Sequence, residues 1–201
     1  MIKLHGFPMS PNTKRGQLAL EEAGIPYELV PVDLMTGEHR KPDYTGLNPT
    51  MRVPTLVDGE FKLWESNAIL HYVAALAPEK RLDGDSPKER GEVSRWMFMN
   101  AAHLSPGVAH IFAHTIRLPE DKRIPQLVEL ARVEVDRCVS PLDAHLKGRN
   151  FLLDRLTIAD LSIGATLAMA AFVGIDLSKY ANVTAWLSRL KERPSFKKVY
   201  G

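Results

Sequence analysis

Cysteine is almost absent from this chain, with Cys138 the only one among 201 residues. A single cysteine excludes a disulfide within the chain and a zinc site built from several thiolates. It is also typical of the reducing cytoplasm, where we expect the protein to work. The seven histidines show no HExxH or comparable spacing, and His110 and His114 lack a third ligand, so we expect no bound metal.

Long apolar runs and an excess of one charge are missing as well. The longest apolar stretch, 163–175, has 13 residues, whereas a membrane-spanning helix needs about 20. The 26 basic and 24 acidic side chains leave a net charge of +2, so we expect no nucleic-acid or membrane partner. Neither a P-loop nor a GxGxxG motif occurs. Hydrophobic (45%) and charged (25%) fractions are those of an ordinary globular protein.

The first 80 residues mix short β-type runs with helical ones. Gly24 is placed to end the first helix, and Asp58-Gly59 to turn a hairpin. The pattern predicts strands at Ile2–Gly6, Tyr27–Asp33, Thr55–Val57 and Phe61–Trp64, and helices at Asn12–Ala23 and Ser66–Ala77.

From Ser86 onward no strand pattern remains. Two capping boxes, Ser86–Glu89 and Thr157–Asp160, mark the starts of helices. We predict helices from Ser86 to about Leu104, over Pro125–Leu146, from Thr157, and over Val183–Glu192, ending before Pro194. The polar stretch around 79–86 is the best linker, so we predict domains at 1–78 and 87–201.

Ser10 stands between the first strand and the first predicted helix, and has two interpretations. Its hydroxyl can cap the helix, with Pro11 at the first helical position. Alternatively, the same hydroxyl lies at the positive end of the helix, where an anion is stabilised. The two interpretations describe one geometry and do not exclude each other.

Three further stretches each have two interpretations, one structural and one functional. Glu65-Ser66 can cap the next helix, or bind the ammonium and carboxylate of an amino acid. The Val53-Pro54 bond can be an ordinary trans bond, or a cis bond that turns the Val53 backbone towards an extended peptide. The stretch 37–41 (GEHRK) can be a solvated loop, or a cationic loop for a peptide carboxylate. Cys138 has the spacing of a core-facing helical position.

Together these signals resemble a known family. The stretches FPMSPNTKR, LEEAGIPYELVPVDL, GEHRKPDY, NPTMRVPTLVDG, LWESNAIL and TIADLSIGA are similar, in order and spacing, to those of cytosolic glutathione transferases. The resemblance runs from end to end and is strongest to serine-type bacterial and plant phi-like members. It implies an α/β thioredoxin-like N-terminal domain that binds glutathione, followed by an all-α domain that carries the second-substrate site.

The resemblance also implies roles for individual residues. Ser10 stabilises the glutathione thiolate, and Asn12 supports it. The glutathione-binding residues are implied to be His39 and Arg40 at the glycyl carboxylate, Arg52 with an undetermined contact, Val53 and cis Pro54 at the cysteinyl backbone, and Glu65 and Ser66 at the γ-glutamyl end. As our own prediction, beyond what the resemblance implies, the wall for the second substrate contains Met9, Met99, His103 and Phe112, with core packing the alternative for each. Asp160 resembles the family's folding element, and a homodimer is implied.

The implied activity is conjugation of glutathione, as co-substrate, to small hydrophobic electrophiles, a detoxification reaction. The alternatives are a glutathione-dependent peroxidase or isomerase on the same fold, and a non-catalytic glutathione- or ligand-binding protein. Some positions depart from the pattern: Arg52 stands where phi-like members often carry glutamine, and Thr50-Met51 replaces a common Phe-Gly. Ser10 occupies the position of the beta-type catalytic cysteine, which disfavours thiol–disulfide exchange through the enzyme.

Overall fold

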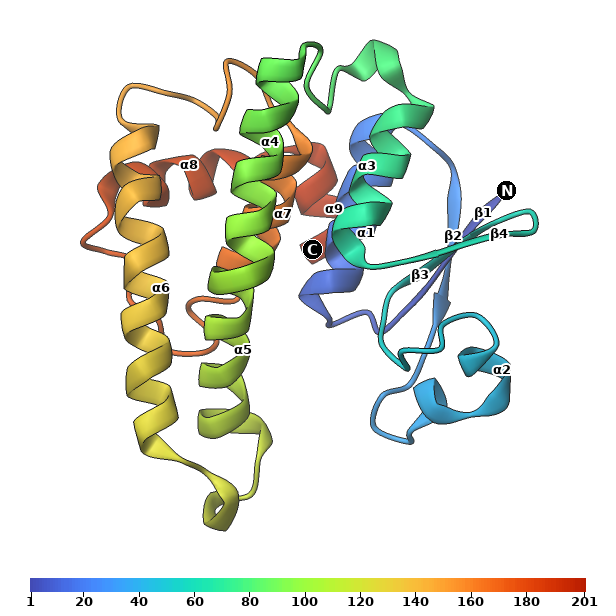
Figure 1. Cartoon of the computed structure of the whole chain (residues 1–201), viewed down its shortest axis with the longest axis horizontal. Helices are drawn as coiled ribbons and strands as arrows, with labels where there is room; N and C mark the ends of the chain where they lie inside the picture. The colour runs from blue at the N-terminus through green and yellow to red at the C-terminus, as the bar shows by residue number, and fades with distance from the viewer. The chain divides into compact units, whose positions relative to one another are not determined.

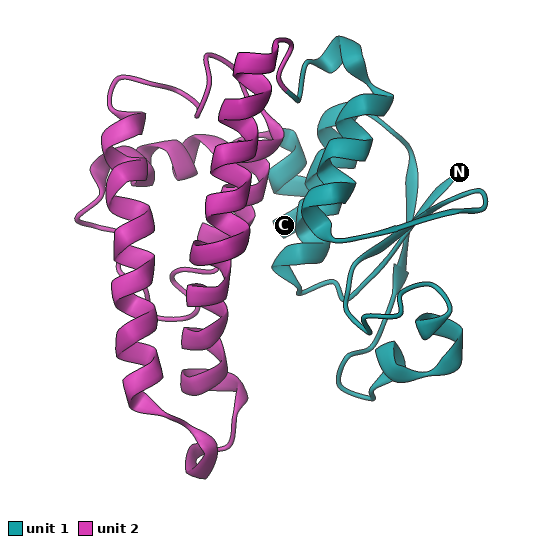
Figure 2. Ribbon diagram, in the orientation of Figure 1, with its two compact units in different colours: residues 1–83, 194–201 teal, residues 84–193 magenta.

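The computed structural model describes residues 1–201, which form two compact units (Figure 2). Unit 1 comprises Met1–Asp83 together with Pro194–Gly201, and unit 2 comprises Gly84–Arg193. The chain leaves unit 1 inside the predicted linker 79–86. The structure differs from the predicted helical domain 87–201 at its end, because residues 194–201 pack in unit 1.

Unit 1 is built on a four-stranded sheet of order β2-β1-β3-β4 (Figure 1). β1 pairs parallel to β2 and antiparallel to β3, and β3 pairs antiparallel to β4. Gly59, with φ of 60°, turns the β3–β4 hairpin. The strands are β1 (Ile2–Gly6), β2 (Tyr27–Pro31), β3 (Thr55–Asp58) and β4 (Phe61–Trp64), close to their predicted ranges.

Two helices pack together on one side of this sheet, α1 (Pro11–Ala23) and α3 (Ser66–Leu76) (Figure 1). α1 ends at Gly24, whose φ of 69° is the left-handed conformation predicted for it. The core between helices and sheet contains the buried side chains Leu4, Leu18, Leu20, Leu56, Ile69 and Leu70. A short turn, Glu38–Arg40, and α2 (Pro42–Thr45) connect β2 to β3. The predicted thioredoxin-like fold is confirmed.

Unit 2 is entirely helical, as predicted. Its centre is α7 (Ile158–Leu167), in which every residue is buried. α7 packs against α4 (Pro87–Met99) and α8 (Ala181–Lys191), and the other α-helices of the unit are α5 (Ser105–Phe112) and α6 (Pro125–Leu146), which pack against each other. No helix of the chain combines the length and the apolar character needed to cross a membrane.

The helix predicted to end near Leu104 continues beyond it. α4 passes into a π-helical segment, Asn100–Leu104, then into α5 and a second π-helical segment, Ala113–Arg117. Pro106 has no N–H to bond to the carbonyl of residue 102, and widening to the π pattern accommodates such a missing bond without ending the helix. The sequence alone did not reveal this continuation.

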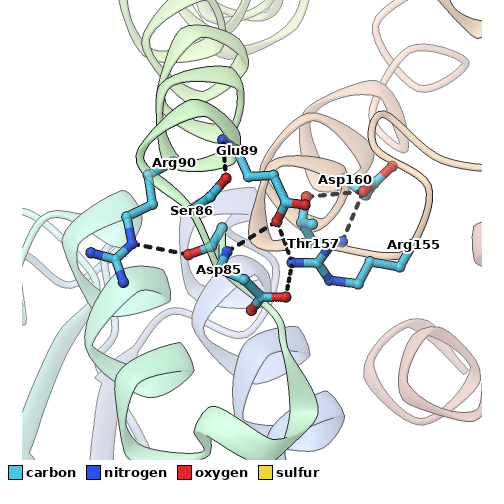
Figure 3. A network of polar contacts seen from close by, with 8 residues as sticks. Asp85, Ser86, Glu89, Arg90, Arg155, Thr157 and Asp160 are labelled. Carbon is cyan, nitrogen blue, oxygen red and sulfur yellow. Dashed lines mark hydrogen bonds and ion pairs between the residues drawn. The ribbon is translucent and has the colours of Figure 1, made fainter.

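The capping box predicted at the start of α4 is only half formed (Figure 3). Ser86 Oγ accepts the Glu89 backbone N–H at 3.2 Å, as predicted. The Glu89 carboxylate, however, accepts the N–H of Asp85 at 3.0 Å instead of that of Ser86. It also pairs with Arg155 at 2.9 Å, and Arg155 lies 3.2 Å from the Asp85 carboxylate. The first turn of α4 is thereby joined to the segment before α7.

The second predicted capping box, Thr157–Asp160, is present at the start of α7. The buried Asp160 carboxylate accepts hydrogen bonds from the Thr157 N–H, the Leu152 N–H and Trp186 Nε1, each at 2.9 Å. Burial raises the pKa of Asp160 to about 6, and the donors oppose the rise. Its contacts are those of a folding element rather than of a reacting group, which fits the role the resemblance implies.

Pro194 starts a helix that the sequence analysis missed. The prediction ended the last helix before Pro194, and α8 does end at Lys191. Proline at the first position then opens α9 (Pro194–Tyr200). α9 packs against α1 in unit 1.

Candidate functional site

Ser10 occupies the N-cap position of α1, but its hydroxyl does not cap the helix. Its backbone is extended, with φ of −70° and ψ of 126°, and its carbonyl accepts the Lys14 N–H at 3.0 Å. The side chain makes no capping hydrogen bond. The capping interpretation is therefore wrong for the side chain. A half-buried hydroxyl at the positive end of a helix is left to interact with an anion.

Arg15 joins two of the predicted site segments. Its guanidinium Nη1 donates to Asn12 Oδ1 at 2.7 Å, within α1, and to Ser66 Oγ at 3.1 Å, at the start of α3. Arg15 is only 3% exposed. Burial lowers its pKa to about 10, while the Tyr200 phenol and the Glu65 carboxylate oppose that change. It therefore remains charged at neutral pH.

Sequence analysis missed Arg15 because basic residues in a helix are usually solvated. The available signal is its spacing of three residues from Asn12, which places both side chains on one face of α1. The tertiary contact with Ser66 has no local signature.

Glu65 and Ser66 form the sharp entry into α3. Glu65 has φ of 72° and ψ of 111°, a conformation that is strained for a residue other than glycine. Its side chain does not cap the helix, and the residue is exposed. Ser66 is 8% exposed, and its hydroxyl oxygen accepts the bond from Arg15. The site thus contains one exposed carboxylate next to a hydroxyl fixed by a buried cation.

The Val53–Pro54 bond is cis, which confirms the cis alternative. Two side chains hold the loop before it: Asn48 Nδ2 and the Tyr44 hydroxyl both donate to the Arg52 carbonyl, at 2.8 and 2.6 Å. The Arg52 side chain is exposed. Sequence analysis missed Tyr44 and Asn48 as positioning residues, although the Asn48-Pro49 turn was visible.

His39 and Arg40 lie in the short turn after β2. Glu38 fixes this turn, because its carboxylate accepts the Asp33 N–H at 2.7 Å. Arg40 is exposed. His39 is half-buried, and its buried Nδ1 has no hydrogen-bond partner within the chain. An unsatisfied buried nitrogen is costly, and because Nδ1 is closed off from the surface, a ligand can bond to it only after the ring turns.

Within unit 2, the residues predicted for the second-substrate wall have different neighbours. His103 Nδ1 lies 3.3 Å from Glu134 on α6, and His103 lines a groove of about 280 Å³ with Pro106 and Leu130. Phe112 does not line that groove, and its ring packs 6.1 Å from the ring of Phe172. Met99 is half-buried at the end of α4, and in unit 1 Met9 is 68% exposed.

Cys138 lies buried in α6, at the predicted core-facing position. Burial raises the pKa of its thiol to about 11, so the reactive thiolate is scarce at neutral pH. No group of three histidine, cysteine or acidic side chains is arranged to hold a metal ion.

Sequence comparison finds relatives across the whole chain. Profiles described as "Glutathione S-transferase, N-terminal domain" and "Glutathione S-transferase, C-terminal domain" match residues 1–75 and 125–189. Glutathione S-transferase GstB of Escherichia coli K12 is 35% identical, with 99% of this chain and 97% of that protein covered. The probable glutathione S-transferase GSTF2 of rice is 36% identical over 98% of this chain and 95% of its own length.

Solved structures show the same fold. The glutathione transferase URE2P6 of Phanerochaete chrysosporium, in complex with oxidized glutathione, superposes with a TM-score of 0.91 at 28% identity, covering 99% of this chain and 94% of that one. The theta-class enzyme of Xanthomonas axonopodis pv. citri, with glutathione bound, gives a TM-score of 0.88 at 30% identity, covering 98% and 95%.

Proposed function

This chain belongs to the glutathione S-transferase family, and we propose that it activates the thiol of glutathione for attack on small hydrophobic electrophiles. The observation that carries the proposal is the Ser10 hydroxyl, which is free of the helix that it precedes. A hydroxyl in this position donates to a thiolate, and the helix N-terminus adds its positive potential. Such a site needs no general base from the protein.

The γ-glutamyl end of glutathione fits the Glu65–Ser66 segment. The exposed Glu65 carboxylate binds the ligand's ammonium. Ser66 Oγ already accepts a hydrogen bond from Arg15, so its own proton is available to donate to the ligand's carboxylate. The buried charge of Arg15 strengthens that bond, and its hydrogen bond to Asn12 fixes this side chain two residues after Ser10.

The rest of the tripeptide has partners in unit 1. The Val53 backbone, beside cis Pro54, pairs with the cysteinyl residue, and the Arg52 carbonyl fixed by Asn48 holds that loop in place. His39 and Arg40 face the glycyl carboxylate. The unpartnered Nδ1 of His39 supports this assignment if the ring turns when the ligand binds, and the exposed Arg40 supports it directly.

For the electrophile we propose Met99 and Phe112 as wall residues in unit 2, and Met9 of unit 1 stays a prediction from the sequence. His103 remains the weakest candidate, because its imidazole lies beside Glu134. We also propose that the chain works in the cytoplasm as a homodimer, as the family membership and the single cysteine support.

Steady-state assays with aryl halides, organic hydroperoxides and cis–trans isomerisable substrates test the function. Conjugation should be the fastest glutathione-dependent reaction, and it should depend on Ser10. Faster hydroperoxide reduction or isomerisation would assign the alternative activities. Glutathione binding without any turnover would assign a binding protein and contradict the proposal.

A further inference from the structure

The last helix of the chain packs on the helix that carries the thiol-activating residues (Figure 1). α9 runs antiparallel to α1. Near the C-terminal end of α1, Ser195 Oγ donates to the Glu22 carboxylate and Lys198 Nζ lies 2.8 Å from the Glu21 carboxylate. The end of α9 therefore reaches the first turns of α1.

Lys14 makes two contacts with that end of α9. Its Nζ donates to the Val199 carbonyl at 2.7 Å and stands 4.2 Å from the centroid of the Tyr200 ring. An ammonium over an aromatic face is attracted by the ring's quadrupole. The Tyr200 ring in turn stacks on Phe196, with centroids 5.7 Å apart and planes at 11°, and Phe196 is 2% exposed. Lys14 thus packs against an aromatic pair whose inner ring, that of Phe196, is buried.

Arg15 follows Lys14 directly and points its guanidinium at Asn12 and Ser66. Tyr200 lies within electrostatic reach of Arg15: burial raises the pKa of the phenol, and the nearby guanidinium opposes the rise. Both bonds come from the single nitrogen Nη1, and hydrogen bonds from a charged donor depend on geometry, so a small shift of this turn of α1 misaligns the Arg15 contacts.

We propose that Tyr200, through its contact with Lys14, is a positioning residue that keeps Arg15 aligned with Asn12 and Ser66 and so sets the affinity for glutathione. This inference rests on the proposed function of Ser66 at the γ-glutamyl end. Residues 194–201, which follow unit 2 in the sequence, therefore form part of unit 1, the unit proposed to bind glutathione.

Two substitutions test the contact itself. Tyr200→Leu removes the ring, whereas Lys14→Met keeps the Tyr200–Phe196 stack and removes both Lys14 contacts. Each should raise the Kd and KM for glutathione by about threefold to tenfold. The kcat at saturating glutathione and the pKa of the bound thiol should remain those of the wild type, because Ser10 is untouched. Tyr200→Phe keeps the ring and should restore wild-type affinity.

Lys198→Met is the matched control, because it removes an α9–α1 contact at the end far from Arg15. It should leave the Kd for glutathione within about twofold of wild type. Isothermal titration calorimetry on the full chain measures each Kd, and circular dichroism checks folding. An equal rise in Lys198→Met, or wild-type affinity in both folded Tyr200→Leu and Lys14→Met, would overturn the inference alone. A wild-type chain that does not bind glutathione would overturn the proposed function as well.

Discussion

Arg15 Nη1 and Ser66 Oγ are 3.1 Å apart although 51 residues separate them in the sequence. This bond ties the start of α1 to the start of α3, so that two helix N-termini are held together by one buried cation. Because positive charge and two helix N-termini meet there, the region is suited to the carboxylate end of an amino-acid ligand.

Replacing Ser10 should change the ionisation of the bound thiol. In Ser10→Ala the thiolate loses a charge-assisted hydrogen bond of about 1.5–3 kcal/mol, so the apparent thiol pKa should rise by about one to two units. The conjugation rate at neutral pH should fall and should recover as the pH rises. Ultraviolet titration of the bound thiolate, with a pH–rate profile, measures this shift.

Two further readouts accompany the Ser10 experiment. Since the Ser10 hydroxyl makes no capping bond, Ser10→Ala should lose less than about 1 kcal/mol of stability, which is the usual cost of deleting a capping side chain. Its glutathione affinity should change little. Coincident thiolate titrations in both proteins would assign thiol activation to Asn12 or to backbone amides.

Replacing Glu65 should weaken binding more than chemistry. The Glu65 carboxylate is exposed in the free chain and is covered when the ligand binds; removing one partner of such a covered ion pair costs about 2–5 kcal/mol, so Glu65→Ala should bind glutathione far more weakly. Glutathione that lacks the γ-glutamyl amine should lose affinity for the wild type but show little additional loss with Glu65→Ala. Strictly additive losses would show that Glu65 does not meet that amine.

Glu65→Gly distinguishes the contribution of the strained backbone at this residue from that of its carboxylate. Glycine accepts the φ of 72° without strain, so this variant should be about 1 kcal/mol more stable than Glu65→Ala. It should bind glutathione equally poorly. Urea denaturation and calorimetric titration measure the two properties.

Replacing Arg15 should damage both the fold and the site. Arg15→Met leaves Asn12 Oδ1 and Ser66 Oγ without this donor, which should cost about 1–3 kcal/mol of stability, and glutathione affinity should fall. Arg15→Lys retains the charge but lacks the planar fork, so it should recover only part of that affinity. Wild-type affinity in folded Arg15→Met would exclude a role for this cation in binding.

The buried Asp160 carboxyl should give stability a distinct pH dependence. Its pKa is about 6 in the folded chain and near 3.8 when unfolded, so the folded chain binds more protons between these values. The free energy of unfolding should therefore fall by about 2 kcal/mol as the pH rises from about 4 to 6, and should level off above about pH 7. The difference between wild type and Asp160→Asn in urea denaturation, followed from pH 4 to 7, isolates this effect. A difference that does not vary over this range would contradict the prediction.

Cys138 should be dispensable for catalysis. Cys138→Ala leaves a small cavity in α6 and should lower stability by about 1–2 kcal/mol. Turnover per folded molecule should not change, because the thiol is buried and un-ionised at neutral pH. Inactivity of a folded, glutathione-binding Cys138→Ala variant would instead indicate a redox role for this thiol.

Local sequence determined the four strands of unit 1 and its helices α1 and α3, the position of Ser10 before α1 and the capping box at Asp160. These features depend on neighbours within a few residues, namely apolar periodicity, Gly24 after a helix, and Thr157 three residues before Asp160. The cis bond at Pro54 was one of two alternatives, and the structure decided between them.

Tertiary structure alone decided the contacts between distant segments. Arg15 with Ser66, α9 with α1, and Glu89 with Arg155 each join residues that no local pattern connects. The different neighbours of His103 and Phe112, Glu134 and Phe172, likewise depend on which element each face of a long helix meets. The physical reason is that a side chain such as that of Arg15 suits solvent as well as a buried site until packing removes the water around it.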